Sequence, residues 1–230
     1  MNPVVQAQMD KFRNANPSVH LSETDFFEVF SIHSVANGLK SESMDPFGVH
    51  LEGKEFGLDG IAILIQGVLC RNSDDVKDCL AHGKNHEIEF CLFQSKTSEK
   101  IEYGELSKFF DASFQFLTGD FLDPTAQLQD LIDAKNAVYD EALKRNPKLH
   151  LYYVTTGKGE LSNQNSKLVD ATTARFDEQN IFSDIQITTP GAKSIQDGYR
   201  SATNSNSKDV EINKPITLPD HPSVQQAFLG

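Results

Sequence analysis

Two short apolar segments have the length and composition of β-strands, and each is bounded by glycine, asparagine or charged residues. They comprise residues 57–67 (GLDGIAILIQG) and 87–96 (EIEFCLFQSK). Because side chains on a strand alternate between the two faces of a sheet, Gln94 and Lys96 continue one apolar row and Asp59 begins another. An antiparallel pairing of the two strands would therefore bring Asp59, Gln94 and Lys96 to the same end of the sheet.

Helices are predicted where apolar residues recur at intervals of three and four. The first begins at Ser22, an N-cap residue, and continues through Phe26, Phe27 and Phe30 toward residue 39. Four more are expected over residues 103–117, 123–146, 162–180 and 193–199. Residues 1–20 hold no strong apolar period and are assigned to an N-terminal arm or a short helix.

Further strands are predicted at residues 49–56, 149–155, 181–189 and 210–218, the last at a sheet edge because prolines interrupt it. Residues 68–86 are expected to form an insertion with a short surface helix. This order of elements predicts an α/β fold, in which helices flank a mixed central sheet that is antiparallel at first and parallel later. Residues 155–159 (TTGKG) suggest a phosphate loop, but they lack the GxxxxGK[ST] order and a helix directly afterwards, so a turn is predicted.

An Asp, a Gln and a Lys at one end of a sheet suit a hard divalent cation beside a phosphate group. The Asp59 carboxylate supplies the anionic oxygen that Mg²⁺ prefers, and the Gln94 side chain offers a neutral one. The Lys96 ammonium is a compact charge for a phosphate oxygen or an attacking water molecule. These three residue types therefore indicate metal-assisted chemistry on a phosphate.

The order of these residues resembles a known nuclease class. Asp59 followed by Gln94-Ser95-Lys96 resembles the D…QxK variant of the PD-(D/E)xK, restriction-endonuclease-like nucleases. The longer segments GLDGIAI, FCLFQSKTSEKIEYGELSKFF and LHLYYVTTG are similar to the N-terminal part of AIPR proteins, the abortive-infection phage-resistance family. The similarity extends from about residue 22 to the C-terminus, and FQSKTS with GELSKFF is its most specific part.

This resemblance implies a phosphodiesterase that uses Mg²⁺ or Mn²⁺ to cleave nucleic acid and leaves a 5′-phosphate. DNA is expected as the substrate in preference to RNA. Asp59, Gln94 and Lys96 would be the catalytic residues, and Asp59 and Gln94 would also bind the metal. A restriction-endonuclease-like core would occupy residues 21–218, and residues 219–230 would begin a following region of a longer protein. That region would contribute to nucleic-acid binding. The protein could form a homo-oligomer, and no membrane partner is expected.

Glu28 is a polar exception on the first predicted helix. It lies at helical spacing from Ile32, Val35 and Leu39, so it points along the apolar stripe toward the core. Two interpretations stay open. Glu28 is either an Arg-paired or water-bridged carboxylate at the edge of the stripe, or an additional metal ligand on the helix where the resemblance implies a Glu.

The formal net charge of −12 opposes tight DNA binding by this chain alone, because Lys and Arg contacts to phosphates supply most non-specific affinity. A nuclease must therefore neutralise its site with metal ions or carry a basic region elsewhere. The charge favours two rival hypotheses, a catalytically silent nucleic-acid-binding or sensing module with the same fold, and an acidic domain that mimics DNA. The intact set of Asp59, Gln94 and Lys96 favours catalysis.

Cysteine usage and hydropathy bear on the compartment. The three cysteines, at positions 70, 79 and 91, follow no disulfide-like pattern, as expected in a reducing environment. No apolar stretch approaches the roughly 20 residues of a membrane span, and the N-terminus lacks a basic-then-apolar signal. We therefore expect a cytoplasmic protein.

Overall fold

The computed structural model describes residues 1–36, 44–53, 57–81, 86–119, 121, 123–141 and 146–205. Within them, a five-stranded sheet has the strand order β2-β1-β3-β4-β5. The strands are β1 Gly60–Ile65, β2 Val68–Cys70, β3 Ile88–Lys96, β4 Lys148–Thr155 and β5 Asp184–Thr188. β1 is antiparallel to both β2 and β3, whereas β3, β4 and β5 are parallel. The predicted α/β fold with a mixed sheet is confirmed.

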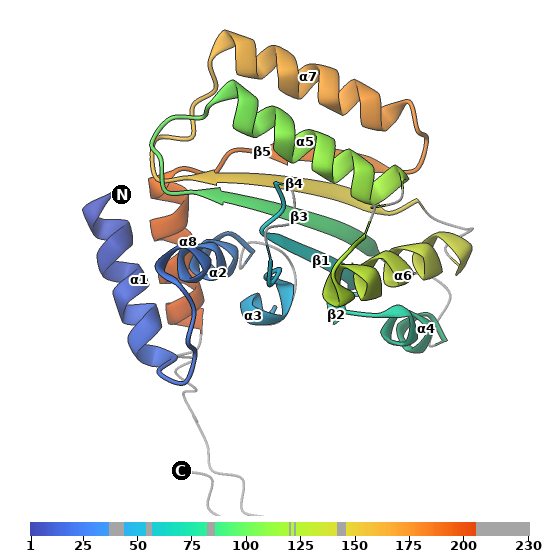
Figure 1. Cartoon of the computed structure of the whole chain (residues 1–230), viewed down its shortest axis with the longest axis horizontal. Coiled ribbons are helices and arrows are strands. Elements are labelled where there is room, and N and C mark those ends of the chain that lie inside the picture. Colours follow the sequence, from blue (N-terminus) through green and yellow to red (C-terminus); the bar gives the residue numbers. More distant parts are fainter. Residues whose placement is uncertain are drawn as a thin grey trace, which may run out of the picture.

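Helices cover both faces of this sheet (Figure 1). Those in the described residues are α1 Pro3–Ala15, α2 Glu23–Ala36, α3 Pro46–Val49, α4 Ser73–Ala81, α5 Tyr103–Thr118, α6 Ala126–Glu141, α7 Asn163–Asp177 and α8 Ala192–Ser205. Helices α4 to α7 pack on one face, and α1, α2, α3 and α8 pack on the other. Because two parallel strands need a long crossover, α5 and α6 connect β3 to β4, and α7 connects β4 to β5.

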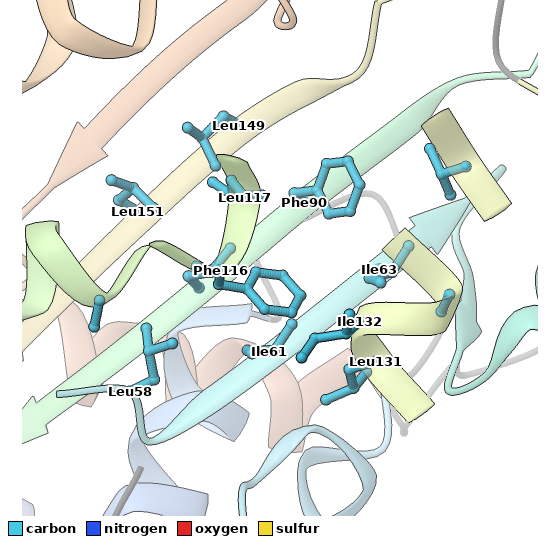
Figure 2. Close-up of a cluster of buried hydrophobic side chains, with 14 of the residues drawn as sticks. Leu58, Ile61, Ile63, Phe90, Phe116, Leu117, Leu131, Ile132, Leu149 and Leu151 are labelled. Carbon is cyan, nitrogen blue, oxygen red and sulfur yellow. The ribbon is translucent and has the colours of Figure 1, made fainter. Parts of the chain in front are cut away.

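The larger core lies between the sheet and helices α5 and α6 (Figure 2). Residues of one face of β1, β3 and β4 meet the apolar sides of the two helices, and they include Ile61, Ile63, Phe90, Leu149, Leu151, Phe116, Leu117, Leu131 and Ile132. All six residues of β1 are buried, because the opposite face of the sheet packs against α2 and α3. Burial on both faces explains why the central strands are almost continuously apolar in sequence.

The structure corrects two sequence-based predictions. The strand predicted at residues 49–56 is not found in its described part, residues 49–53: Val49 ends α3, which Asp45 caps with Pro46 at its first position, and His50 makes an isolated bridge to Gly60. Residues 54–56 lie outside the described residues. Residues 68–86 contain strand β2 in addition to the surface helix α4. Gln66 and Gly67 both have positive φ angles and form the two-residue turn of a hairpin between β1 and β2. Gln-Gly is not one of the pairs that usually indicate such a turn, so the sequence did not predict it.

The first twenty residues contribute to the fold. α1 buries Val5, Met9 and Phe12 in the second core, which also holds residues of α2 and α8. This spacing of four and three residues is a helical one, although polar neighbours weaken the pattern. The predicted strand at 210–218 and the following region at 219–230 lie outside the described residues. No helix in the described part of the chain is long and apolar enough to cross a membrane.

Helices α2 and α8 cross at close range because α8 carries a glycine at the contact. A Cβ added to Gly198 would overlap the carbonyl oxygen of Ser34 on α2. Gly104, in the first turn of α5, has no atom within 4 Å of the position that a Cβ would take. The two helical glycines therefore offer a matched comparison of the same substitution in a packed and in an open place.

We expect Gly198→Ala to lower the free energy of unfolding by about 2 kcal/mol or more, because the backbones of α2 and α8 must separate. Gly104→Ala should raise it by about 0.5 to 1 kcal/mol, since alanine is the better helix former. Chemical denaturation of the three proteins measures both changes. Equal stabilities of the two variants would show that the crossing does not depend on Gly198.

Candidate functional site

The main chain fixes Asp59 at the start of β1, between β3 and the segment that follows α3. Its N–H donates to the carbonyl oxygen of Phe93 at 2.8 Å, and its carbonyl oxygen accepts from the N–H of Leu51 at 3.0 Å. The antiparallel register pairs the next residue, Gly60, with Phe93. The predicted antiparallel pairing of the two strands is confirmed, and it places Asp59 beside the C-terminal end of β3.

The Asp59 carboxylate receives two short hydrogen bonds from that strand end. Its Oδ2 accepts from Nε2 of Gln94 and from the backbone N–H of Ser95, both at 2.6 Å. Asp59 and Gln94, 35 residues apart in sequence, are therefore in direct contact. The amide nitrogen of Gln94, and not its oxygen, faces Asp59, so Gln94 acts here as a hydrogen-bond donor to the carboxylate.

Lys96 lies two residues further along β3 and is paired with an acid on α5. Its Nζ is 3.1 Å from Oε2 of Glu105, and Lys108 pairs with the other oxygen of the same carboxylate at 2.9 Å. About a third of the Lys96 side chain is exposed, at 32%. The ammonium is thus reachable from solvent at the sheet end, next to Asp59, and is held by a surface carboxylate.

Glu28 does not contact Asp59 but belongs to a second polar cluster. Its Oε2 is 2.9 Å from Nε2 of His50, and the two side chains are only 15% and 5% exposed. Asp25, one turn earlier on α2, completes a group whose ligand atoms lie within 4.8 Å of one another. The protein partner of Glu28 among the described residues is therefore His50, and not the arginine that its sequence position suggested.

The charge of Glu28 affects the pKa of Asp59, so the two clusters interact electrostatically. Burial first, and the negative charge of Glu28 second, raise the pKa of the Asp59 carboxyl to about 7. The N–H of Ser95, the Lys96 ammonium and the Gln94 amide act in the opposite direction but are outweighed. Asp59 therefore exchanges its proton near neutral pH, a property that is common among residues of functional sites.

The donor set suits a hard or borderline divalent cation. The carboxylate oxygens of Asp25 and Glu28 suit Mg²⁺ or Mn²⁺, and the imidazole of His50 is accepted by Mn²⁺. Asp59 offers a further carboxylate oxygen, but it does not belong to the group whose ligand atoms lie within 4.8 Å of one another. A cation beside Asp59 would offset the burial of its charge and the repulsion by Glu28, which together raise its pKa. Gln94 could offer its carbonyl oxygen only after the amide turns away from Asp59.

Three residues of this region were missed from the sequence. Asp25 is three positions before Glu28, a spacing that puts both on one side of α2, so its place could have been inferred. His50 and Glu105 carried no such signal. They reach the site because residue 50 forms a bridge to Gly60 and because α5 begins directly beyond the loop that follows Lys96.

Comparisons of this chain with protein-family models, with curated proteins and with solved structures find no match.

The raised pKa of Asp59 predicts a pH-dependent effect of Asp59→Asn. The unfolded chain loses this proton near pH 4 and the folded chain near pH 7, so ionisation destabilises the fold increasingly between these values and fully above pH 7. Asparagine keeps an acceptor for Gln94 and Ser95 without the charge. Asp59→Asn should therefore be more stable than the parent at pH 8, by about 2 kcal/mol or more, and nearly equal to it at pH 4.

Thermal and chemical unfolding between pH 4 and pH 8 measure this difference in the absence of divalent metal. The exposed Asp170, which makes no hydrogen bond or ion pair among the described residues, provides the control variant Asp170→Asn. A stability difference between Asp59→Asn and the parent that does not change with pH would contradict the assigned pKa.

Proposed function

We propose that this chain is a divalent-metal-dependent phosphodiesterase, the endonuclease domain of a bacterial anti-phage protein of the abortive-infection type. One observation carries the proposal: an Asp with a pKa near neutrality lies against the Gln of a Gln-x-Lys segment at the end of a sheet strand. The Lys of that segment is partly open to solvent two residues further on. This set matches the Asp, Gln and Lys that the sequence resemblance implies for the active site.

The acidic residues would hold the cation. Asp59 is the first ligand, and Glu28, with Asp25 and His50 beside it, supplies further oxygen and nitrogen donors from α2 and the segment after α3. A bound Mg²⁺ or Mn²⁺ polarises the scissile phosphate and lowers the pKa of a water molecule. Since Asp59 is partly protonated at neutral pH, cation binding should release a proton and strengthen as the pH rises.

Lys96 would act on the phosphate. Its ammonium can orient the attacking water molecule or stabilise the negative charge that develops on the phosphate oxygens. Glu105 holds this ammonium at the sheet end in the absence of substrate, and it shares its charge with Lys108. Because Glu105 is only half-buried, a phosphate can replace it as the partner of Lys96 without leaving a buried charge unpaired.

A catalytically silent nucleic-acid-binding or sensing module of the same fold is the second candidate. Two observations favour it: the Gln94 amide already satisfies Asp59, and Lys96 already has a carboxylate partner. The formal net charge of −12 also favours it over an efficient nuclease. Cleavage assays separate the two candidates because only the enzyme needs Asp59 and Lys96 for turnover.

Asp59→Asn should abolish metal-dependent cleavage while the protein stays folded, because it removes the first ligand of the cation. Lys96→Ala should lower the cleavage rate by about 10²-fold or more and leave Mn²⁺ binding intact, since an ammonium does not bind a cation. Nicking of a plasmid, and cleavage of single-stranded DNA and RNA, measure the activity. Calorimetry with Mn²⁺ measures the binding.

The variant Asp170→Asn should cleave at the parental rate. Cleavage by folded Asp59→Asn at that same rate would overturn the proposed site. Loss of Mn²⁺ binding in Lys96→Ala would overturn the role given to the lysine. No cleavage of any substrate by the parent protein would favour the silent module.

Gln94→Glu tests whether the two clusters share one cation. A second carboxylate at hydrogen-bond distance from Asp59 should destabilise the metal-free protein by repulsion. Mn²⁺ should bind this variant at least about tenfold more tightly than the parent and restore its stability. The same change should partly rescue cleavage by Glu28→Gln, because it returns a carboxylate to the ion from the other side. If Glu28→Gln cleaves as well as the parent, Glu28 serves only as the partner of His50.

A further inference from the structure

A cavity of about 740 Å³ lies at the end of the sheet where the parallel strands terminate. It is lined by residues of the loops after β3 and β4 and of the starts of α7 and α8. Figure 1 shows where these strands and helices lie in the fold. Asn2, the N-cap of α1, completes the wall. Ligands of open α/β sheets bind preferentially outside the carboxyl ends of parallel strands, which is the position of this cavity.

The cavity is locally positive in an acidic chain. Lys100, Lys158 and Lys193 line it together with Glu99 and Glu160, so cations exceed anions there, whereas the whole chain carries a formal net charge of −12. Each lysine comes from a different loop or helix start and is exposed. None of the three ammonium groups makes an ion pair with a described residue. Three unpaired cations that converge on one cavity attract an anion.

Backbone groups add to this attraction. α7 and α8 both begin at the wall of the cavity, and the N-terminus of a helix carries a partial positive charge with unpaired N–H groups. The loop after β4 packs closely against its neighbours and has no room for side chains at its glycines. A Cβ on Gly157 would overlap the carbonyl oxygen of Glu99, and one on Gly159 would overlap that of Thr189. The loops after β3, β4 and β5 are therefore closely packed against one another.

A buried polar side chain also lines the cavity with an unused acceptor. Asn165 is 3% exposed, and its Nδ2 donates to the carbonyl oxygen of Ile101 at 2.8 Å. This hydrogen bond fixes the orientation of the amide, and its Oδ1 accepts no hydrogen bond from any described residue. An unpaired acceptor on a buried side chain, in a cavity lined by three lysines, fits a ligand that carries both an anion and a hydroxyl or amino donor.

We infer that this cavity binds a phosphate group of a nucleic-acid strand, adjacent to the phosphate that is cleaved. The identity of the ligand rests on the proposed function, and the anion-binding character rests on the cavity itself. The loop that carries Lys100 begins directly after Lys96, so one strand of nucleic acid can contact both places. The cavity thus supplies the basic region that so acidic a chain needs to hold its substrate.

Binding of a fluorescent single-stranded oligonucleotide in EDTA, which prevents cleavage, tests this inference. The variant Lys100→Gln/Lys158→Gln/Lys193→Gln should bind at least about tenfold more weakly at low salt than the parent. The slope of log K against log salt should become shallower by about 2, at about 0.7 for each lost contact with a single strand. The three side chains are exposed, so folding should be unaffected, which circular dichroism verifies.

The control variant is Lys11→Gln/Lys77→Gln/Arg200→Gln, which removes the same number of positive charges from exposed positions outside the cavity. It should retain the parental affinity to within about twofold. Equal losses in the two triple variants would overturn the inference, because the effect would then come from total charge. Competition by millimolar inorganic phosphate that acts on the parent but not on the cavity variant would support a site for a single phosphate group.

The two failures can be told apart. If the cavity variant loses oligonucleotide binding and no protein cleaves, the cavity stands and the proposed nuclease function fails. If the parent cleaves in an Asp59-dependent manner and the cavity variant binds and cleaves as the parent does, the nuclease function stands and the inference is overturned. If inorganic phosphate or a free mononucleotide binds as tightly as the oligonucleotide, the phosphate site stands and its source is a soluble ligand.

Discussion

The antiparallel pairing of β1 with β3 is the constraint on which the candidate site depends. Its register puts Gly60 opposite Phe93, so Asp59 falls beside the last residues of β3 and receives hydrogen bonds from Gln94 and Ser95. A slip of one residue would turn Asp59 to the other face of the sheet and separate these groups. Burial of β1 on both faces makes such a slip costly, because isoleucine side chains fill the core on one side and Gly60 fits closely against α2 on the other.

The fold holds the Asp59 carboxylate in a place where its negative charge is unfavourable. Asp59 is removed from water and lies within reach of the charge on Glu28, and both effects favour its protonated form. The opposing hydrogen bonds are short, yet they do not restore an ordinary pKa. Such a carboxyl gains from a cation as well as from a proton, because either one neutralises it. The same physical arrangement would thus destabilise the metal-free protein above neutral pH and favour metal binding.

Charge is distributed unevenly over the chain. The formal net charge is −12, and yet the cavity at the carboxyl ends of β3 and β4 gathers three lysines and the starts of two helices. Lys96 of the candidate site is joined to the cavity by the loop that carries Lys100. A polyanionic strand would be repelled by most of this surface and attracted to one end of the sheet, which gives position through repulsion as well as attraction.

The sequence by itself determined four of the five described strands, most of the helices, the mixed sheet and the convergence of Asp59 with Gln94. These features follow from local apolar periodicity and from the alternation of side chains on a strand, which depend on near neighbours in sequence. Only the tertiary structure decided that Glu28 pairs with His50, that Lys96 pairs with Glu105, and that Lys100, Lys158 and Lys193 share a cavity. Those contacts join elements whose separation is set by packing of whole helices against the sheet. The strand expected at 49–56 is absent from residues 49–53 for a related reason: Asp45 and Pro46 begin a helical turn that includes Val49, and the bridge between His50 and Gly60 stays isolated.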